Sequence, residues 1–220
     1  MQSKEVLRQL RVQRNPHNVA GMARFGINPR NTLGVSIPTL RRIARQAGKD
    51  HRLAQELWKS GIHEARILAA LVDVPEQVTE AQMERWVKDF DSWDVCDQVC
   101  SNLFDKTRFA RRKAIEWSKR DEEFVKRAGF VMMAALAVHD KTAPDVVFRK
   151  FLALIQRGAT DERNFVKKAV NWALRKIGKR NTALNRAAQA TAREIQQIDS
   201  RAARWIAADA LRELKMKTKG

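Results

Sequence analysis

The segment 91–104, with the sequence DSWDVCDQVCSNLF, holds the residues best suited to chemistry. It places one indole, that of Trp93, and three carboxylates, those of Asp91, Asp94 and Asp97, within seven residues. At about 100° per residue, a helix through this segment has an apolar face made of Val95, Cys96, Val99, Cys100 and Leu103. Trp93 then lies at one edge of that face, and Asp97 projects just beyond it.

The three carboxylates occupy different positions on this helix. Asp91 or Ser92 is placed to cap its N-terminus, and Asp94, in the first turn, suits the helix dipole and faces the polar side. Asp97 is too far into the helix to cap it, and it lies one turn from Trp93 on the same side. Helix formation therefore does not explain the carboxylate of Asp97, which makes it the candidate reactive group.

A second informative helix is expected over 165–179, where a tryptophan points away from the apolar face. That face is formed by Phe165, Val166, Ala169, Val170, Ala173, Leu174 and Ile177. Trp172 lies instead among four cations, Lys168, Arg175, Lys176 and Lys179. Two interpretations stay open: a stacking platform in an electropositive groove, and a shielded tryptophan stabilised by cation–π contacts.

Arg127 lies near the start of an otherwise apolar helix expected over 121–139. From this rigid base its guanidinium can reach out to a phosphate. It can equally pair with Asp121 or Glu123, and spacing alone favours neither interpretation.

No other pattern of reactive residues is complete. The histidines, at 17, 51, 63 and 139, lack metal-ligand spacing, and the sequence has no glycine-rich phosphate loop, no Ser-His-Asp order and no Cys-His nucleophile setting. Cys96 and Cys100, the only cysteines, indicate neither a disulfide framework nor a zinc site. We expect them to be small buried hydrophobic residues.

The net charge of +18 is concentrated at the two ends of the chain. Residues 1–48 carry nine basic residues and one acidic residue, and residues 163–220 carry fifteen and four. Residues 49–162 are close to neutral. Two basic ends around a neutral middle indicate a concave or clamp-like site for a polyanion, with DNA or RNA as the leading candidate. The alternative is a basic surface without a specific partner.

The chain reads as a succession of helices, because period-2 patterns are absent and Ala, Leu, Arg, Lys and Glu dominate. Ser36 and Pro38 mark the start of a helix that runs to Gln46 and presents Arg41, Arg42 and Arg45. Two short helices precede it, over 3–13 and from Pro16 to about residue 25. Further helices are expected over 50–59, 62–73, 79–90, 92–104, 107–119, 121–139, 144–157, 161–178, 182–197 and 199–215.

These helices form pairs whose alternate members begin near 62, 92, 122, 162 and 199. A spacing of roughly 30 to 40 residues between helical hairpins is typical of an α-solenoid such as HEAT repeats. The helix over 121–139 favours stacking over an irregular bundle, because 130–138 is apolar on every side and must be covered on both faces. We therefore predict one all-α domain over 1–220, a solenoid of stacked antiparallel helix pairs with a concave basic groove.

The surroundings of the protein can also be predicted. No apolar run reaches the roughly 18–20 residues that span a bilayer. The N-terminal residues MQSKE lack the apolar core of a signal peptide, so we expect a cytoplasmic protein without a membrane partner. Nothing in the sequence demands more than a monomer.

Three short motifs follow one another along the chain: SWDVCD at 92–97, FVKRA at 124–128 and KAVNWALR at 168–175. A weaker echo is LGVSIP at 33–38, followed by Arg41 and Arg42. With these motifs the chain resembles the bacterial DNA alkylation-repair glycosylases of the AlkD type, which are built from HEAT-like repeats.

The resemblance implies a role for each of a small set of residues. By this resemblance Asp97 is the catalytic aspartate, and Trp93 and Trp172 are the two cleft tryptophans. The contacts to the DNA backbone are Arg127, Arg175 and Lys179. Phe25 is one further aromatic ring. Phe25 stands where relatives often have a tyrosine, so the ring is kept and any hydrogen bond of the hydroxyl is lost.

The resemblance further implies hydrolysis of the N-glycosidic bond of cationic N3- or N7-alkylated purines, such as 3-methyladenine and 7-methylguanine, in double-stranded DNA during base excision repair. It implies no metal or organic cofactor, and a cytoplasmic protein that associates with the nucleoid when bound to DNA. Two alternatives remain: a non-catalytic relative that binds distorted or branched DNA through its backbone, and a HEAT-like scaffold for a protein partner. The intact Asp97 argues against the first, and the net charge of +18 argues against the second.

Overall fold

The structure is a computed structural model, and it describes residues 1–215. Within these residues thirteen α-helices and two short 3-10 helices occur, and no strand does. The prediction of an all-α fold is confirmed. In the same part of the chain, no helix combines the length and the apolar character needed to cross a membrane.

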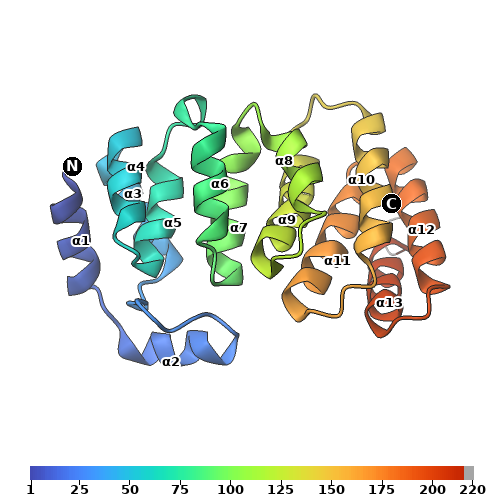
Figure 1. Cartoon of the computed structure of the whole chain (residues 1–220), viewed down its shortest axis with the longest axis horizontal. Coiled ribbons are helices and arrows are strands. Elements are labelled where there is room, and N and C mark those ends of the chain that lie inside the picture. Colours follow the sequence, from blue (N-terminus) through green and yellow to red (C-terminus); the bar gives the residue numbers. More distant parts are fainter. Residues whose placement is uncertain (216–220) are drawn as a thin grey trace. The chain divides into compact units, whose positions relative to one another are not determined.

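The helices group into two compact units, residues 1–108 and the residues from Phe109 onward, and Figure 1 gives their order. Unit 1 contains α1 (Ser3–Val12), α2 (Pro16–Arg24), α3 (Ile37–Ala47), α4 (His51–Lys59), α5 (His63–Val72), α6 (Glu80–Lys88) and α7 (Trp93–Asn102), with the 3-10 helices Pro75–Gln77 and Phe104–Lys106. Unit 2 contains α8 (Ala110–Trp117), α9 (Glu123–His139), α10 (Asp145–Gly158), α11 (Asn164–Gly178), α12 (Thr182–Gln196) and α13 (Arg201–Lys215). A single domain over 1–220 stays a prediction.

Local signals in the sequence explain where many of these helices begin. Ser36 caps α3 as predicted, because its Oγ accepts a hydrogen bond from the Thr39 N–H at 3.4 Å and Pro38 follows in the first turn. Asp50, Thr79 and Asn181 cap α4, α6 and α12 in the same way. The alternate helices predicted near 62, 92, 122, 162 and 199 are α5, α7, α9, α11 and α13, which confirms the repeat period.

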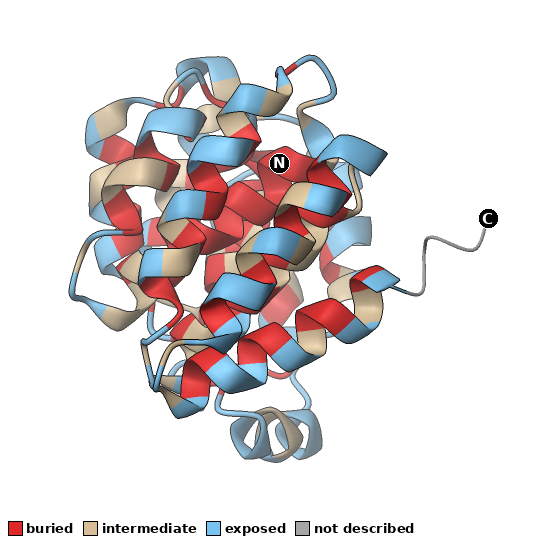
Figure 2. Ribbon diagram, turned by 90° about the vertical axis from the view of Figure 1, so that its right-hand side faces the viewer, coloured by how far each residue is buried: buried red, intermediate tan, exposed pale blue. Residues whose placement is uncertain are grey.

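The core of unit 1 is built around α5, which packs against α3, α4 and α7. An aromatic stack supports it, since the rings of Trp58 and Trp86 lie parallel with centroids 4.0 Å apart. The predicted apolar face of α7, including Cys96 and Cys100, is fully buried. Figure 2 shows that single helices of the fold carry a buried stripe and an exposed stripe.

The core of unit 2 is built around α9 and α11, which pack against each other; α9 also contacts α8, and α11 also contacts α12 and α13. Every residue of α9 from Ala128 to Ala137 is buried, so the prediction that this helix is covered on both faces is confirmed. A Cβ added at Gly129 would lie 2.3 Å from the backbone nitrogen of Ser118. The glycine therefore permits the close approach of α9 to the end of α8.

Candidate functional site

Asp97 and Trp93 lie one turn apart on α7, and both are half-buried. This confirms the shared helix side that the sequence predicts for the two residues. Beneath them, burial and the hydrogen bond with Cys96 raise the pKa of the Cys100 thiol well above its ordinary value, and the charge of Asp97 adds to the shift. The thiol is therefore held protonated, which confirms that Cys100 behaves as a small hydrophobic residue.

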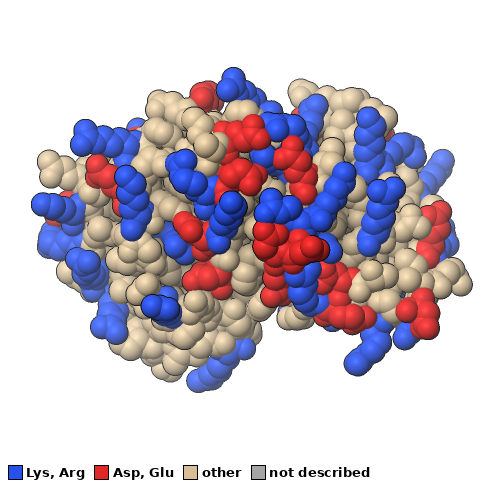
Figure 3. Space-filling model, viewed as in Figure 1, with Lys and Arg blue, Asp and Glu red and all other residues tan. Residues whose placement is uncertain are grey.

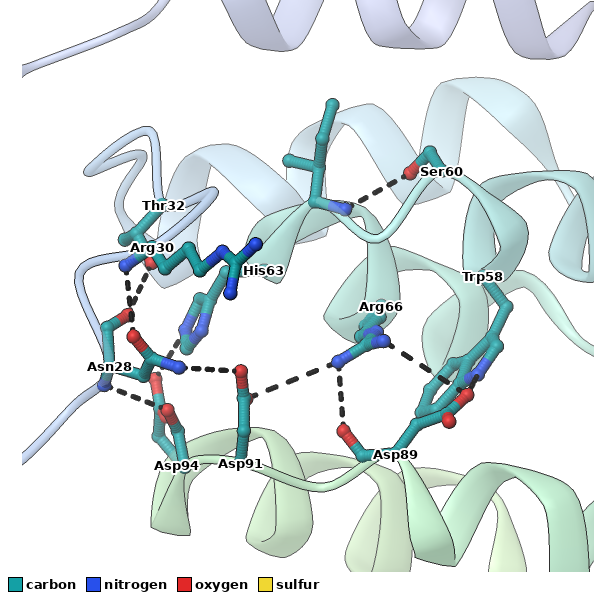
Figure 4. A network of polar contacts seen from close by, with 12 residues as sticks. Asn28, Arg30, Thr32, Trp58, Ser60, His63, Arg66, Asp89, Asp91 and Asp94 are labelled. Carbon is teal, nitrogen blue, oxygen red and sulfur yellow. Dashed lines mark hydrogen bonds and ion pairs between the residues drawn. The ribbon is translucent and has the colours of Figure 1, made fainter.

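The start of α7 is tied to the segment 25–28, which follows α2. The indole N–H of Trp93 donates to the backbone oxygen of Phe25 at 3.0 Å. The backbone N–H of Asn28 donates to Ser92 Oγ at 2.9 Å, and its Nδ2 donates to Asp91 Oδ2 at 2.9 Å (Figure 4). Because the ring of Trp93 and the side chains of the two residues before it all bond to this segment, unit 1 brings Phe25 and Trp93 together in a defined arrangement.

These contacts correct the predicted cap of α7. Ser92 does occupy the N-cap position, but no side-chain hydrogen bond caps the helix there. Ser92 is buried against Asn28, so its hydroxyl satisfies the N–H of that loop, and the carboxylate of Asp91 is taken by the Asn28 amide. The two polar groups that could cap α7 instead join it to a segment more than sixty residues earlier in the sequence.

Asp94 lies in the first turn of α7, as predicted, and it also has a partner on another helix that the sequence did not predict. Its Oδ2 lies 2.8 Å from Nε2 of His63 on α5, and both side chains are largely shielded from solvent. Burial acts to lower the pKa of His63, but the hydrogen bond and charge of Asp94, with smaller contributions from Glu64 and Asp91, outweigh it and raise the pKa. The contact between the imidazole and the carboxylate links α5 to α7.

The stability of unit 1 is expected to depend on pH through His63. Because the pKa of His63 is higher in the folded state than its ordinary value of 6.5, the contribution is complete below that value and is lost as pH rises through the raised pKa. Urea titrations of the wild type and His63→Gln should therefore show a difference in unfolding free energy that shrinks between acidic and alkaline pH. The exposed His17, replaced by Gln, is the control. A difference that grows with pH would contradict the assignment.

A hollow of about 630 Å³ adjoins this part of unit 1, between α2, the loop after it, α5 and α7. Phe25, Trp93, His63 and Asp94 contribute to its walls. Glu64 also lines this hollow. It is 1% exposed and accepts hydrogen bonds from the backbone N–H groups of residues 33, 34 and 35 at 2.6 to 3.2 Å. Sequence reasoning missed Glu64 because its backbone partners lie about thirty positions earlier in the chain.

In unit 2, Trp172 is half-buried on α11, on the side that also carries Arg175 and Lys179. Both cations are paired with carboxylates of α13: Arg175 Nη1 lies 3.1 Å from Asp209 Oδ2, and Glu213 forms ion pairs with Arg175 and Lys179. The picture of a tryptophan surrounded only by cations is therefore wrong. Sequence reasoning missed the two acidic residues because they lie more than thirty positions further along the chain.

Arg127 is held inside unit 2. Its side chain is 5% exposed in a helix whose other buried residues are apolar, and Nη1 donates to the backbone oxygen of Phe165 at 2.5 Å. The ring of Phe165 stacks on Phe124, with centroids 5.6 Å apart. The expectation that the guanidinium simply reaches outward is therefore corrected: Arg127 joins α9 to the start of α11. Its contact with DNA stays a prediction.

The described residues thus place the predicted site residues in two groups. Unit 1 holds Phe25, Trp93 and Asp97, and unit 2 holds Trp172 with Arg175, Lys179 and Arg127. Within residues 1–215, no three His, Cys, Asp or Glu side chains are arranged to hold a metal ion. The predicted site residues thus supply one half-buried carboxylate, tryptophan rings and several cations, and His63 and Asp94 line the hollow next to Trp93 as well.

Successive helical hairpins whose alternate helices stack within each unit define a HEAT-like repeat protein. The chain belongs to the DNA alkylation repair enzyme family, whose pattern it matches over residues 6–216. No curated protein matches the sequence.

Comparison with solved structures supports the fold. One similar structure is described as "a new family of proteins related to the HEAT-like repeat DNA glycosylases with affinity for branched DNA structures". It superposes with a TM-score of 0.80 at 19% identity, over 96% of this chain and 95% of its own. A designed armadillo repeat protein matches at 15% identity over 80% of this chain and 91% of its own, with a TM-score of only 0.35.

Proposed function

We propose that this protein is a DNA glycosylase that hydrolyses the N-glycosidic bond of cationic N3- and N7-alkylated purines, such as 3-methyladenine and 7-methylguanine, in base excision repair. The observation that supports it most is the pair Trp93 and Asp97 on α7 of a chain in the DNA alkylation repair enzyme family. Asp97 neither caps its helix nor belongs to the apolar core, and it is half-buried one turn from Trp93.

The chemistry needs only one carboxylate. Alkylation places a positive charge on the base, so the base leaves as a neutral molecule without being protonated, whereas ordinary glycoside hydrolysis uses an acid and a base. The sugar left behind has oxocarbenium character at C1′. Asp97 stabilises that charge and orients the attacking water. The water oxygen bonds to C1′, and its proton passes to Asp97 and then to solvent.

The remaining predicted residues hold the DNA. In unit 1, Trp93 packs against the deoxyribose of the damaged nucleotide and Phe25 adds a second ring, and in unit 2 Trp172 packs against the DNA backbone. Arg175 and Lys179 contact phosphates. Arg127, which is 5% exposed, holds the start of α11, the helix that carries Arg175. Since Arg175 and Lys179 are paired with Asp209 and Glu213, a phosphate in contact with them competes with these carboxylates or shares the cations with them.

A second candidate function is the binding of branched DNA without catalysis. It is favoured by the similar structure described as having affinity for branched DNA. Such a protein needs cations and aromatic rings for the backbone but has no use for the carboxylate of Asp97.

Release of bases from methylated duplex DNA separates the two candidates. We expect the wild-type protein to liberate 7-methylguanine or 3-methyladenine, identified by chromatography, and to bind a four-way junction no more than modestly better than a duplex. Absence of any released base, together with clear preference for the junction, would support the second candidate and overturn the first.

A further inference from the structure

The outer side of α3 carries three arginines without a carboxylate partner. Arg41, Arg42 and Arg45 are exposed and lie within a 100° arc of the helix, since Arg45 is one turn from Arg41 and three residues from Arg42. In residues 1–215 none of the three takes part in an ion pair, whereas Arg175 and Lys179 in unit 2 are neutralised by α13. Three charges so close together repel one another and favour an anionic partner.

The rest of the N-terminal segment strengthens this field. Glu5 is the only acidic residue among residues 1–48, and it is already paired with Arg8 at 2.8 Å. Figure 3 shows that Lys and Arg side chains predominate over the helices at the N-terminal end. The basic character inferred from the sequence for residues 1–48 is therefore present as uncompensated charge on α3.

The surface around α3 is hollowed on both sides of the helix. A hollow of about 340 Å³ is lined by Arg41, Arg45 and Lys49, and another of about 280 Å³ is lined by Arg8 and Arg42. Lys49 is held in place because its Nζ donates to the backbone oxygens of Leu71 at 3.0 Å and Asp73 at 2.8 Å. Guanidinium groups beside such hollows can contact phosphate oxygens with two parallel N–H groups.

We propose that Arg41, Arg42 and Arg45 form a binding surface for the DNA backbone that is separate from the residues assigned to the damaged nucleotide. The choice of DNA as the partner rests on the proposed function. The surface contacts phosphates without reading sequence, so it contributes affinity and salt dependence and leaves the chemical step unchanged.

The test is the salt dependence of binding to an undamaged duplex. Replacing all three arginines by alanine is expected to weaken binding at least tenfold at low salt. It should also reduce the slope of log K against log salt by about 2 to 3, because each lost phosphate contact contributes about 0.9. Replacing the three arginines by lysine should preserve the slope of log K against log salt. This result would show that the loss in the alanine variant comes from the missing charges and not from a folding defect.

A matched control removes the same charge from another helix. Arg149, Lys150 and Arg157 on α10 are exposed cations without an ion pair in the described chain, and their triple alanine variant loses the same net charge. The α10 variant is expected to keep the wild-type slope. Equal losses in the α3 and α10 variants would overturn the proposal, because the effect would then come from net charge alone.

The outcome can be distinguished from failure of the proposed function. At saturating DNA the α3 variant is expected to release 7-methylguanine at the wild-type rate. If the wild type releases no base but the α3 variant still has a smaller slope of log K against log salt, the proposed activity fails and the binding surface stands. If the wild type releases base and the slope does not change, the binding surface fails and the activity stands.

Discussion

Replacing Asp97 by asparagine is expected to lower the single-turnover rate of 7-methylguanine release by ~100-fold or more, as seen when one key electrostatic group is removed from an active site. Asparagine keeps the size of the side chain but removes the negative charge that stabilises the sugar cation and the basic oxygen that accepts the proton of water. Binding to duplex DNA should change little, because phosphate contacts dominate affinity. Rates at saturating protein, measured by chromatography of the released base, check the prediction.

A matched control is available at the start of the same helix. Asp91 is exposed, lies 4.0 Å from the guanidinium of Arg66 and accepts a hydrogen bond from Asn28. Asparagine in its place retains an acceptor for Asn28, and an exposed ion pair contributes little. The Asp91→Asn variant should therefore release base at close to the wild-type rate. Equal activity of Asp97→Asn and the wild type would remove Asp97 from the mechanism.

The second large effect is expected on stability. Glu64→Ala should lower the free energy of unfolding by about 3–5 kcal/mol, because it leaves buried polar groups without their charged partner. Glu64 is 1% exposed, and its Oε1 accepts from the N–H of Gly34 at 2.6 Å and of Val35 at 3.2 Å. Gly34 has a φ of +79°, and a Cβ there would meet the Asn15 oxygen, so this loop has little freedom to find other partners.

Urea unfolding followed by circular dichroism measures this effect. Glu64→Gln keeps one carbonyl oxygen as an acceptor but turns an NH₂ group toward the same donors, so its stability should lie between those of the wild type and Glu64→Ala. Glu56, whose exposed carboxylate bonds to Ser3 and to Arg52, serves as the control, and its alanine variant should unfold close to the wild type. An alanine variant at position 64 as stable as the wild type would contradict the role of Glu64.

Much of the fold could be predicted because its signals are local. The period of apolar residues located α5, α7, α9, α11 and α13, and the capping signal of Ser36 with Pro38 located α3. The apolar face of α7 also followed from spacing along a single helix. In each case the information lies within about fifteen residues of sequence, where helix geometry fixes which residues share a side.

The polar contacts of the site could not be predicted because they join distant segments. The contact between His63 and Asp94 spans 31 positions, and the bond from Trp93 to the Phe25 oxygen spans 68. Ser92 illustrates the consequence: its type and position indicated a cap, but a partner outside the helix, Asn28, takes its hydroxyl. Helix spacing therefore predicted the side on which Trp93 and Asp97 lie but not the loop that holds Trp93.

The central claim is that the carboxylate of Asp97 suffices because the departing base carries its own positive charge. It is tested most directly by comparing single-turnover release by the wild-type protein from two duplexes of the same sequence, one with 7-methylguanine and one with the neutral base hypoxanthine. We expect release of 7-methylguanine at a rate at least ~100-fold higher, since the proposed mechanism protonates no leaving group and hypoxanthine would have to depart as an anion. Comparable rates for the two bases would contradict the account.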